Sequence, residues 1–589
     1  MLHAPDYSAR IDIARAGCII GHVAYPEYPV QVFTSGTQDI YLEGRIYNVR
    51  AAALESDLKL LADRVFKATG RSEFVRNWII EHDGEYVVVI ADRNTQEIAI
   101  LTDPLGRLPV YYHFDETSLI VARECKFILS FLREWEFDRI GCAQFLWAGY
   151  PLGRRTHFAD VSAAPSAMLL LSSVDGHRLK TSVSTLIDFN LEDKETASKT
   201  PDQYASELVE TIVSTTADRA RHPDVTTNVI SLSGGWDSRI IATALARSTR
   251  RCVAVTYVNA EGRGEKDAQL AMQIAKILEM PCEFVRIRPV RPEDEERLVS
   301  LTDGLNYVSM AYNLPFMEEV VSRWGRRAAY LTGDGGPQII SLKGLRTTVQ
   351  SMDRLVEEII GERSILPITV AEDVMGLGPG TLTDELRNVV SKYPESDFNQ
   401  KGAHFAIFER GRRWGFEGED RARFYMWQTS PFYSYPFYRC GTRIPDRFKR
   451  DNKMYRLFQI KLSPSGSRIP DASTGIPPSS PLLPYAYRLK RYLLTPHNFR
   501  RSLKPFVLRG EFGRSPTPEQ ALSYVHELEL LGEGSLMGGA AVRRMLASAN
   551  KTQYANWWTV ALLDKLIRNG KYGSRTHVFD REQHQARAS

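Results

Sequence analysis

The sequence predicts a β-rich N-terminal region, an α/β region built on a doubly wound parallel sheet, and a helical C-terminal extension. Three observations lead to this prediction. Short apolar runs separated by turns fill the first part of the chain, strands alternate with helices in the middle, and 589 residues are too many for one hydrophobic core. We expect the domain boundaries to give residues 1–195, 196–480 and 481–589.

The first region reads as strands joined by turns. Apolar and β-branched residues fill 85–90, 97–101 and 110–112. The stretch 188–201 (DFNLEDKETASKTP) is polar and charged, as in linkers between folded units. The first boundary is therefore placed near residue 195.

The middle region alternates strands and helices. Residues 226–232 and 252–258 have the composition of buried strands, whereas 239–247 and 266–278 show apolar residues at helical spacing. A strand–helix–strand–helix order implies parallel strands joined by crossover helices.

The stretch 485–514 is rich in Lys and Arg, interleaved with aromatic and aliphatic residues. Helices that pack by their apolar faces and expose basic faces to water are the favoured interpretation. Contact with a polyanion or a membrane surface is the alternative.

The composition is that of an ordinary globular protein, with 43% hydrophobic and 25% charged residues. A net charge of +4 gives no electrostatic footprint for nucleic acid, so we expect small-molecule or peptide partners. We also expect no membrane span and a cytoplasmic location, because residues 1–5 show no charged leader before an apolar run. Six cysteines without CxxC spacing indicate reduced thiols.

The sharpest motif is SLSGGWDSR at residues 231–239, between the predicted strand and helix. Two glycines allow a tight turn and close ligand approach, and the N–H groups at a helix start attract phosphate oxygens. Asp237 would repel a bare phosphate, so its position predicts a bridging Mg²⁺. A simple helix cap is the structural alternative. No Gly-Lys-Ser/Thr sequence follows, so this is not a Walker loop.

These residues resemble the pyrophosphate loop of the asparagine synthetase group within the ATP-pyrophosphatase superfamily, with its SGGxDS signature. Residues 44–48 (GRIYN), 103–112 (DPLGRLPVYY) and 123–126 (RECK) are similar to segments of the group's class II glutaminase domain. Residues 331–336 (LTGDGG) resemble the second glycine-rich loop. The resemblance covers most of residues 15–340.

The resemblance implies an N-terminal glutaminase-like sandwich and an ATP-pyrophosphatase domain that binds ATP and Mg²⁺. Asp237 and Asp334 are the implied catalytic and metal-binding residues. The implied contacts to ATP and pyrophosphate are Ser231, Leu232, Ser233, Gly234, Gly235, Asp237, Ser238, Tyr257, Thr332 and Gly333.

The glutaminase-like part departs from the family pattern at two positions. Class II glutaminases open with a catalytic cysteine whose free α-amino group acts as the base. The equivalent segment here is 17–21 (GCIIG), with Gly17 at the nucleophile position and Cys18 at that of the following glycine. Glu43 stands where the family has an asparagine oxyanion donor, and a carboxylate would repel the developing charge. We expect an inactive glutaminase, even if processing exposed Cys18.

The synthetase part departs as well. Pro337 stands where the family's second loop has an acidic metal ligand, so Asp334 is the expected substitute. Residues 432–437 lack the glutamate of the family's ExRxPFLD segment, and 469–475 lack a clear counterpart of its later lysine. ATP binding is therefore better supported than the identity of the second half-reaction.

Three functions remain open at this point. The first is an ATP-dependent ligase that adenylates a carboxylate and transfers the acyl group to an amine, like β-lactam synthetase or lasso-peptide cyclases, with a precursor peptide or biosynthetic protein as partner. The second is a degenerate ATP-binding scaffold or regulator. The third is a genuine asparagine synthase.

Aromatic residues are dense where the acceptor side of the site is expected. They either pack against a bulky substrate or belong to the core. Arg423, Tyr425 and Arg439 are candidates for binding a substrate carboxylate. The aromatic residues are Trp427, Phe432, Tyr433, Tyr435, Phe437 and Tyr438.

Overall fold

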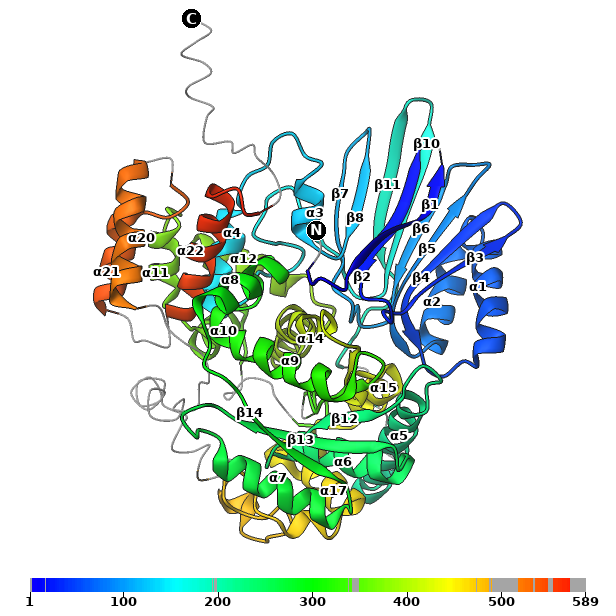
Figure 1. The fold of residues 1–589 in the computed structure, drawn as a ribbon, viewed down its shortest axis with the longest axis vertical. Coiled ribbons are helices and arrows are strands. Elements are labelled where there is room, and N and C mark those ends of the chain that lie inside the picture. Colours follow the sequence, from blue (N-terminus) through cyan, green and yellow to red (C-terminus); the bar gives the residue numbers. More distant parts are fainter. Residues whose placement is uncertain are drawn as a thin grey trace, which may run out of the picture.

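The computed structural model describes residues 3–15, 17–192, 194, 199–336, 338–341, 349–472, 474–486, 489, 517–532, 535–548 and 554–572. Pro337 and most of the basic stretch 485–514 lie outside these residues. Figure 1 shows antiparallel strands at the upper right and a parallel sheet in the lower half. Helices α20 (Pro518–Leu531), α21 (Gly539–Ser548) and α22 (Tyr554–Arg568) lie at the left. The predicted combination of a β-rich region, a parallel sheet and a helical C-terminal part is confirmed.

The N-terminal region holds three antiparallel sheets. Six strands follow the order β11-β10-β6-β5-β4-β3, three follow β8-β7-β9, and β1 pairs with β2. The strands predicted at 85–90, 97–101 and 110–112 are confirmed as β5, β6 and β7. The strands are β1 Ser8–Arg15, β2 Cys18–Ala24, β3 Val30–Ser35, β4 Gln38–Ile46, β5 Gly84–Asp92, β6 Ile98–Thr102, β7 Tyr111–Phe114, β8 Leu119–Ala122, β9 Ser162–Ala163, β10 Met168–Asp175 and β11 Arg178–Thr185.

Helices α1 (Ala51–Val65) and α2 (Arg71–Glu81) cover one face of the six-stranded sheet. Alternation along the strands explains this packing, because successive side chains point to opposite faces. Val88 of β5 joins the core under α1 and α2, whereas its neighbour Val87 joins a second cluster on the other face.

The second sheet is parallel throughout, in the order β14-β13-β12-β15-β16. The predicted strands and helices of this region are confirmed as β12, α6, β13 and α7. The elements up to β15 are α5 Pro201–Ala220, β12 Asn228–Ser231, α6 Trp236–Ser248, β13 Cys252–Val258, α7 Glu265–Ile277, β14 Cys282–Arg286, α8 Pro292–Leu301, η1 Val308–Tyr312, α9 Asn313–Trp324 and β15 Ala329–Leu331.

Helices cover both faces of the parallel sheet. Ile230 of β12 joins a cluster with α5, α6 and α7, while Val229 joins one with α8 and α9 on the opposite face. This is the doubly wound arrangement expected for parallel strands buried on both sides. Strand β16 (Gln428–Thr429) completes the sheet. The helices of this part of the chain are α14 Glu417–Arg423, η4 Pro431–Tyr433, α15 Tyr435–Arg443, α16 Asp446–Lys449, η5 Arg450–Asn452, α17 Lys453–Leu462 and η6 Gly466–Arg468.

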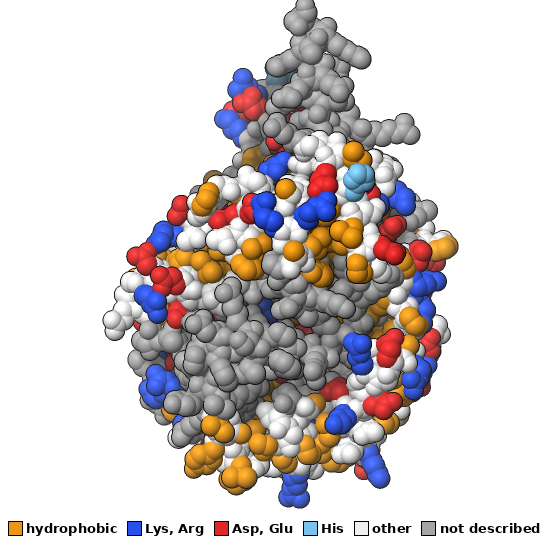
Figure 2. All heavy atoms as spheres, turned by 90° about the vertical axis from the view of Figure 1, so that its left-hand side faces the viewer, with side chains coloured by type: hydrophobic (Ala, Val, Ile, Leu, Met, Phe, Trp, Pro, Cys, Tyr) orange, Lys and Arg blue, Asp and Glu red, His pale blue; other side chains and the backbone are white. Residues whose placement is uncertain are grey.

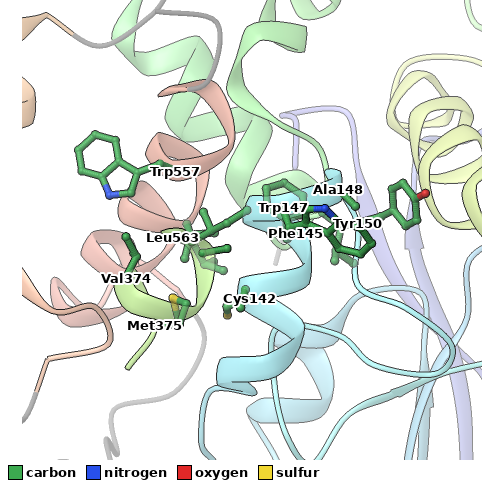
Figure 3. Close-up of a cluster of buried hydrophobic side chains, with 14 of the residues drawn as sticks. Cys142, Phe145, Trp147, Ala148, Tyr150, Val374, Met375, Trp557 and Leu563 are labelled. Carbon is green, nitrogen blue, oxygen red and sulfur yellow. The ribbon is translucent and has the colours of Figure 1, made fainter. Parts of the chain in front are cut away.

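A helical cluster joins segments that are far apart in sequence. Cys142, Phe145 and Trp147 of α4 belong to one buried cluster with Val374 and Met375 and with residues of α22, of which Figure 3 labels Trp557 and Leu563. Residues from all three predicted sequence segments therefore share one core, and the boundaries near 195 and 480 stay predictions. The remaining helices are α3 Cys125–Leu129, α4 Arg139–Ala148, α10 Met352–Arg363, α11 Ile368–Val374, α12 Thr381–Ser391, α13 Phe398–His404, η2 Phe405–Glu409, η3 Gly411–Phe416, α20 Pro518–Leu531, α21 Gly539–Ser548 and α22 Tyr554–Arg568.

A buried ionic network joins the N-terminal sheet to α14. Arg107 pairs with Glu85 and makes a two-pronged contact with Glu419, at 2.8 and 3.0 Å, and all three side chains are fully buried. Arg219 of α5 pairs with Asp83 at 2.8 Å. Charges this deeply buried need such partners.

No described helix is long and apolar enough to cross a membrane. Figure 2 shows acidic and basic side chains interspersed on the face it displays, without a continuous basic patch among the coloured residues. All six cysteines are free thiols, and Cys125 and Cys142 are buried.

Candidate functional site

The candidate site lies where the order of the parallel strands reverses. β12 comes first in sequence, β13 and β14 extend the sheet on one side, and β15 and β16 extend it on the other. Ligands of open α/β sheets bind beyond the carboxyl ends of the strands at such a switch point. The loops after β12 and β15 are the two glycine-rich loops predicted from sequence.

The first loop is held by its own hydroxyl groups. Ser238 Oγ accepts the N–H of Ser233 at 3.0 Å and lies 2.8 Å from Ser233 Oγ. Ser233 Oγ also accepts the N–H of Gly235, the N-cap of α6, at 3.2 Å. Leu232 is buried and anchors the loop in the core. The predicted serines are thus brought together at the start of a helix.

Gly234 is a point of close approach. A Cβ at this position would lie 2.9 Å from Leu270 Cβ and 3.1 Å from Ala472 Cβ. Its N–H donates to Asp267 Oδ1 at 3.0 Å, and burial raises the pKa of Asp267. The sequence analysis missed Asp267, because only the fold brings the start of α7 to this loop.

Asp237 is half-buried between two elements. Tyr455 of α17 donates its hydroxyl to Asp237 Oδ1. On the second loop, a Cβ on Gly336 would lie only 2.7 Å from Asp237 Oδ1, and one on Gly333 would lie 2.4 Å from the backbone nitrogen of Ser238. The two loops therefore touch: a side chain at 333 would clash with the backbone of the first loop, and one at 336 would displace the Asp237 carboxylate.

Asp334 is positioned by neighbours on both sides. Its Oδ2 accepts the hydroxyl of Thr332 at 2.8 Å, and its backbone oxygen accepts the hydroxyl of Ser430 at 2.7 Å. Asp334 is an exposed residue of the loop, and desolvation by the neighbouring protein raises the pKa of its carboxyl. Gln428 reaches the same oxygen at 3.4 Å.

The carboxylates fit Mg²⁺ only as part of a nucleotide complex. Among the described residues, no three His, Cys, Asp or Glu side chains group closely enough to hold a metal. Mg²⁺ in nucleotide sites keeps several waters and takes one or two carboxylates together with substrate phosphates. Asp237 and Asp334 suit that role, and their metal binding stays a prediction.

Tyr257 lies at the same edge of the sheet. It is two residues beyond Val255, which pairs with Ser231 at the end of β12. Its ring packs against Phe316 at 4.7 Å and faces Tyr312 at 6.0 Å, and burial raises its pKa well above the usual range. Tyr257 therefore lies near the site as part of an aromatic cluster. Its contact with ATP stays a prediction.

Arg421 is a cation that sequence reasoning missed. It is buried, its Nη1 donates to Asn306 Oδ1 at 2.6 Å, and its Nε has no hydrogen-bond partner in the described structure. No described carboxylate forms an ion pair with it, and burial lowers its pKa, while Tyr312, Tyr307 and Asp334 act in the opposite direction. The arrangement could hold an anionic substrate group beside Asp334.

The aromatic run is mostly core, which corrects one hypothesis. Trp427, Phe432, Tyr433, Phe437 and Tyr438 are each at most 2% exposed. Trp427 packs in a cluster with the N-terminal strands, whereas the other four share a core cluster with Ile339 and Ile340, just after the second loop. A surface for a bulky partner is therefore wrong for these five, and Tyr435 alone stays partly exposed.

The core aromatics nevertheless shape the loop. A Cβ on Gly335, whose φ is +86°, would lie 2.5 Å from the Tyr433 ring. Tyr438 donates to Gln338 Oε1 at 3.1 Å. The second loop thus rests on Tyr433 and Tyr438.

Two of the three candidate carboxylate binders are not available. Arg423 is buried and committed to the carbonyl oxygens of Gln428 and Arg107. Tyr425 is 5% exposed and lies under the guanidinium of Arg297. Arg439 is exposed on α15.

The N-terminal candidate site has a different character. Strands β1 and β2 form an antiparallel pair in which Arg15 pairs with Cys18, and Gly17 has φ +78°. The nitrogen of Cys18 is therefore a peptide nitrogen within a hairpin. Burial raises the pKa of the Cys18 thiol, against the opposing effect of Arg15.

Glu43 forms a hydrogen bond and an ion pair with neighbouring side chains. Tyr28 donates to Glu43 Oε1 at 2.5 Å, and Arg123 pairs with the same oxygen. Arg123 also pairs with Asp420 of α14, which ties the N-terminal sheet to the second half of the chain.

Comparison with known protein families identifies one domain of the chain. Residues 19–182 match the family described as glutamine amidotransferase domain. Residues 19–182 form a glutamine amidotransferase-type domain. Gly17 and Cys18 precede the matched residues of this domain, whereas Glu43 and Arg123 lie within them. No curated protein matches the chain.

Two solved structures are similar to the chain only at low scores. The allosteric regulatory enzyme of purine biosynthesis shares 14% identity over 45% of this chain, with a TM-score of 0.18. Glutamine phosphoribosylpyrophosphate amidotransferase from B. subtilis, complexed with ADP and GMP, shares 13% identity over 66%, with a TM-score of 0.20. The similarity covers half of the first protein and 82% of the second. Scores this low carry no argument about the present chain.

Proposed function

We propose that the chain is an ATP-dependent amide-forming ligase. A substrate carboxylate attacks the α-phosphorus of ATP, pyrophosphate leaves, and an amine then attacks the acyl-adenylate to give an amide and AMP. The observation that carries the proposal is the contact between the two glycine-rich loops at the switch point, where Gly333 and Gly336 pack directly against Ser238 and Asp237.

The chain's own groups suit the first half-reaction. Backbone N–H groups of Gly234 and Gly235 and the hydroxyls of Ser233 and Ser238 lie at the start of α6, where phosphate oxygens are favoured. Mg²⁺ would neutralise the pyrophosphate charge next to Asp237 and Asp334. Tyr455 orients Asp237 toward the second loop.

The acyl substrate faces a cation. Arg421 lies within electrostatic reach of Asp334 and forms no ion pair with a described carboxylate. A guanidinium binds carboxylate or phosphate through two parallel hydrogen bonds. Arg421 is therefore the best candidate for orienting the acyl substrate or the adenylate.

The amine does not come from glutamine in this proposal. Cys18 is preceded by a paired strand and has no free amine to act as a base, and Glu43 puts a carboxylate where an oxyanion donor is required. An amine carried by the substrate itself, as in a peptide or natural-product cyclase, fits these features. The product is then an amide other than asparagine.

A second candidate is an ATP-binding scaffold or regulator. The observation that favours it is the hydrogen bond from the Gly234 N–H to Asp267, which takes up a phosphate-binding donor. The ligase requires a phosphate to displace this carboxylate, whereas the scaffold does not.

Pyrophosphate release separates these functions. The purified chain would be incubated with MgATP and a panel of amino acids, N-acyl amino acids and peptides. The ligase predicts release with one carboxylate and amine combination, the scaffold predicts ATP binding without release, and asparagine formed from aspartate and ammonia alone would identify an asparagine synthase.

A further inference from the structure

A cavity lies between the N-terminal region and the parallel-sheet region. Its volume is about 350 Å³, and it is bounded by α5, α15 and the end of α2. Sites for small ligands typically enclose roughly 300–1,000 Å³ and often lie between domains. This cavity therefore has room for a small molecule or a short peptide end.

One wall is a stripe of aromatic and cationic side chains. Tyr435, Arg439 and Arg443 follow one another at four-residue spacing, so they share a face of α15. Burial raises the pKa of Tyr435, while Arg439, Arg443 and Arg76 of α2 act in the opposite direction. The positive charges of these three arginines therefore lie within electrostatic reach of Tyr435.

These cations have no carboxylate partner in the described structure. No described Asp or Glu forms an ion pair with Arg439, Arg443 or Arg76. On the opposite wall, Glu207 of α5 is already paired with Lys199 at 2.8 Å, which leaves Glu210 as the remaining lining carboxylate. Positive charge is thus in excess around the cavity.

We propose that this cavity binds a small acidic ligand, with a carboxylate or phosphate carried on an aromatic or aliphatic body. The guanidinium groups of Arg439 and Arg443 hold the oxyanion, because Arg binds carboxylate and phosphate in a forked geometry. The half-buried ring of Tyr435 packs against the apolar body.

This site is separate from the nucleotide loops and does not depend on adenylation. Its lining shares no residue with the loops after β12 and β15. α15 nevertheless connects the two places, because Tyr438 on another face of the helix donates to Gln338, next to the second loop. A ligand on Arg439 and Arg443 would lie one helix away from that loop.

Titration calorimetry with three probes of one shape tests the proposal. Phenyl phosphate and phenylacetate carry the anion, and phenylacetamide is the neutral control. We expect at least one anion to bind the wild-type chain and the amide to bind at least ~10-fold more weakly. The stronger anion identifies the phosphate or carboxylate class, whereas no binding by either, or equal binding by the amide, overturns the proposal.

Variants then locate the binding. Arg439→Gln combined with Arg443→Gln should weaken the anion at least ~10-fold, whereas Arg447→Gln, an exposed arginine outside the cavity lining, should change it by less than about 2-fold. Equal affinity of the double variant and wild type contradicts the assignment.

Alkylation of Cys440 gives a test that needs no variant. Cys440 lines the cavity and is half-buried, whereas Cys252 lies outside the cavity lining and is also half-buried. The bound anion should slow iodoacetamide labelling of Cys440, mapped by peptide mass spectrometry, and leave Cys252 unchanged. Unchanged labelling of Cys440 at saturating anion places the binding elsewhere.

Discussion

The two candidate sites of this chain differ in what contacts their charged groups. At the switch point, glycines 333 and 336 bring the second loop against Asp237, and Arg421 has no carboxylate partner in the described structure. In the glutamine amidotransferase-type domain, Glu43 is satisfied by Tyr28 and Arg123, and Arg123 continues to Asp420. The first site retains charged groups that a ligand can bind. In the second site the charged side chains form hydrogen bonds and ion pairs with one another.

Asp237→Asn should have the largest effect. It removes the charge intended for Mg²⁺ and keeps the oxygen that accepts from Tyr455, so substrate-dependent pyrophosphate release should fall by at least ~100-fold without unfolding. Asp353→Asn, at an exposed site on α10, is the matched control and should be silent. Retained release in Asp237→Asn would remove the switch-point site from the chemistry.

Gly336→Ala should have the next largest effect. Its Cβ would lie 2.7 Å from Asp237 Oδ1, so the carboxylate must move, and we expect the rate to fall by ~10-fold or more. At Gly378 a Cβ would meet its nearest neighbour at an ordinary 3.7 Å, which makes Gly378→Ala the control. Equal rates for the two variants would show that the loop contact is not functional.

Glu417→Gln tests the boundary between the two regions by its pH dependence. Tyr111 donates to this carboxyl at 2.5 Å, and burial raises its pKa to about 7. Because the pKa of Glu417 is higher in the folded protein, the folded protein keeps this proton at pH values where the unfolded chain has already released it. The free energy of unfolding therefore falls as the pH rises from the ordinary pKa of a glutamate to about 7.

The size of this effect follows from the shift. Denaturation of the wild type between pH 5 and 8 should show a loss of roughly 3 kcal/mol that is absent in Glu417→Gln. Glu116→Gln, at an exposed site, should leave the slope unchanged. Parallel slopes in wild type and Glu417→Gln would contradict the burial argument.

Cys18→Ala should have the smallest effect. Because Cys18 sits in a hairpin and Glu43 is paired with Arg123, glutamine should not be hydrolysed by either form. The measurement is glutamate release from glutamine, with free ammonia as the control nitrogen source. Glutamate produced by the wild type and lost in Cys18→Ala would show that the N-terminal domain is an active glutaminase.

Local sequence patterns predicted the elements that carry the site. Strands β12 and β13, helices α6 and α7 and the first glycine-rich loop follow from hydrophobic periodicity and glycine placement, whereas the second loop was predicted from the family resemblance. Tyr455, Asp267 and Arg421 were missed, because they reach the site only through packing of distant segments. The sequence left the aromatic run open between core and substrate surface, because aromatic density does not reveal whether a segment faces the core or a ligand.

Product identification by ³¹P NMR tests the central claim most directly. Wild-type chain and Asp237→Asn would be incubated with MgATP and the carboxylate and amine panel. We predict AMP and pyrophosphate in equal amounts with the wild type, dependent on substrate and absent from Asp237→Asn. ADP and phosphate as products, or unchanged ATP with every substrate, would contradict adenylation at the β12–β15 edge.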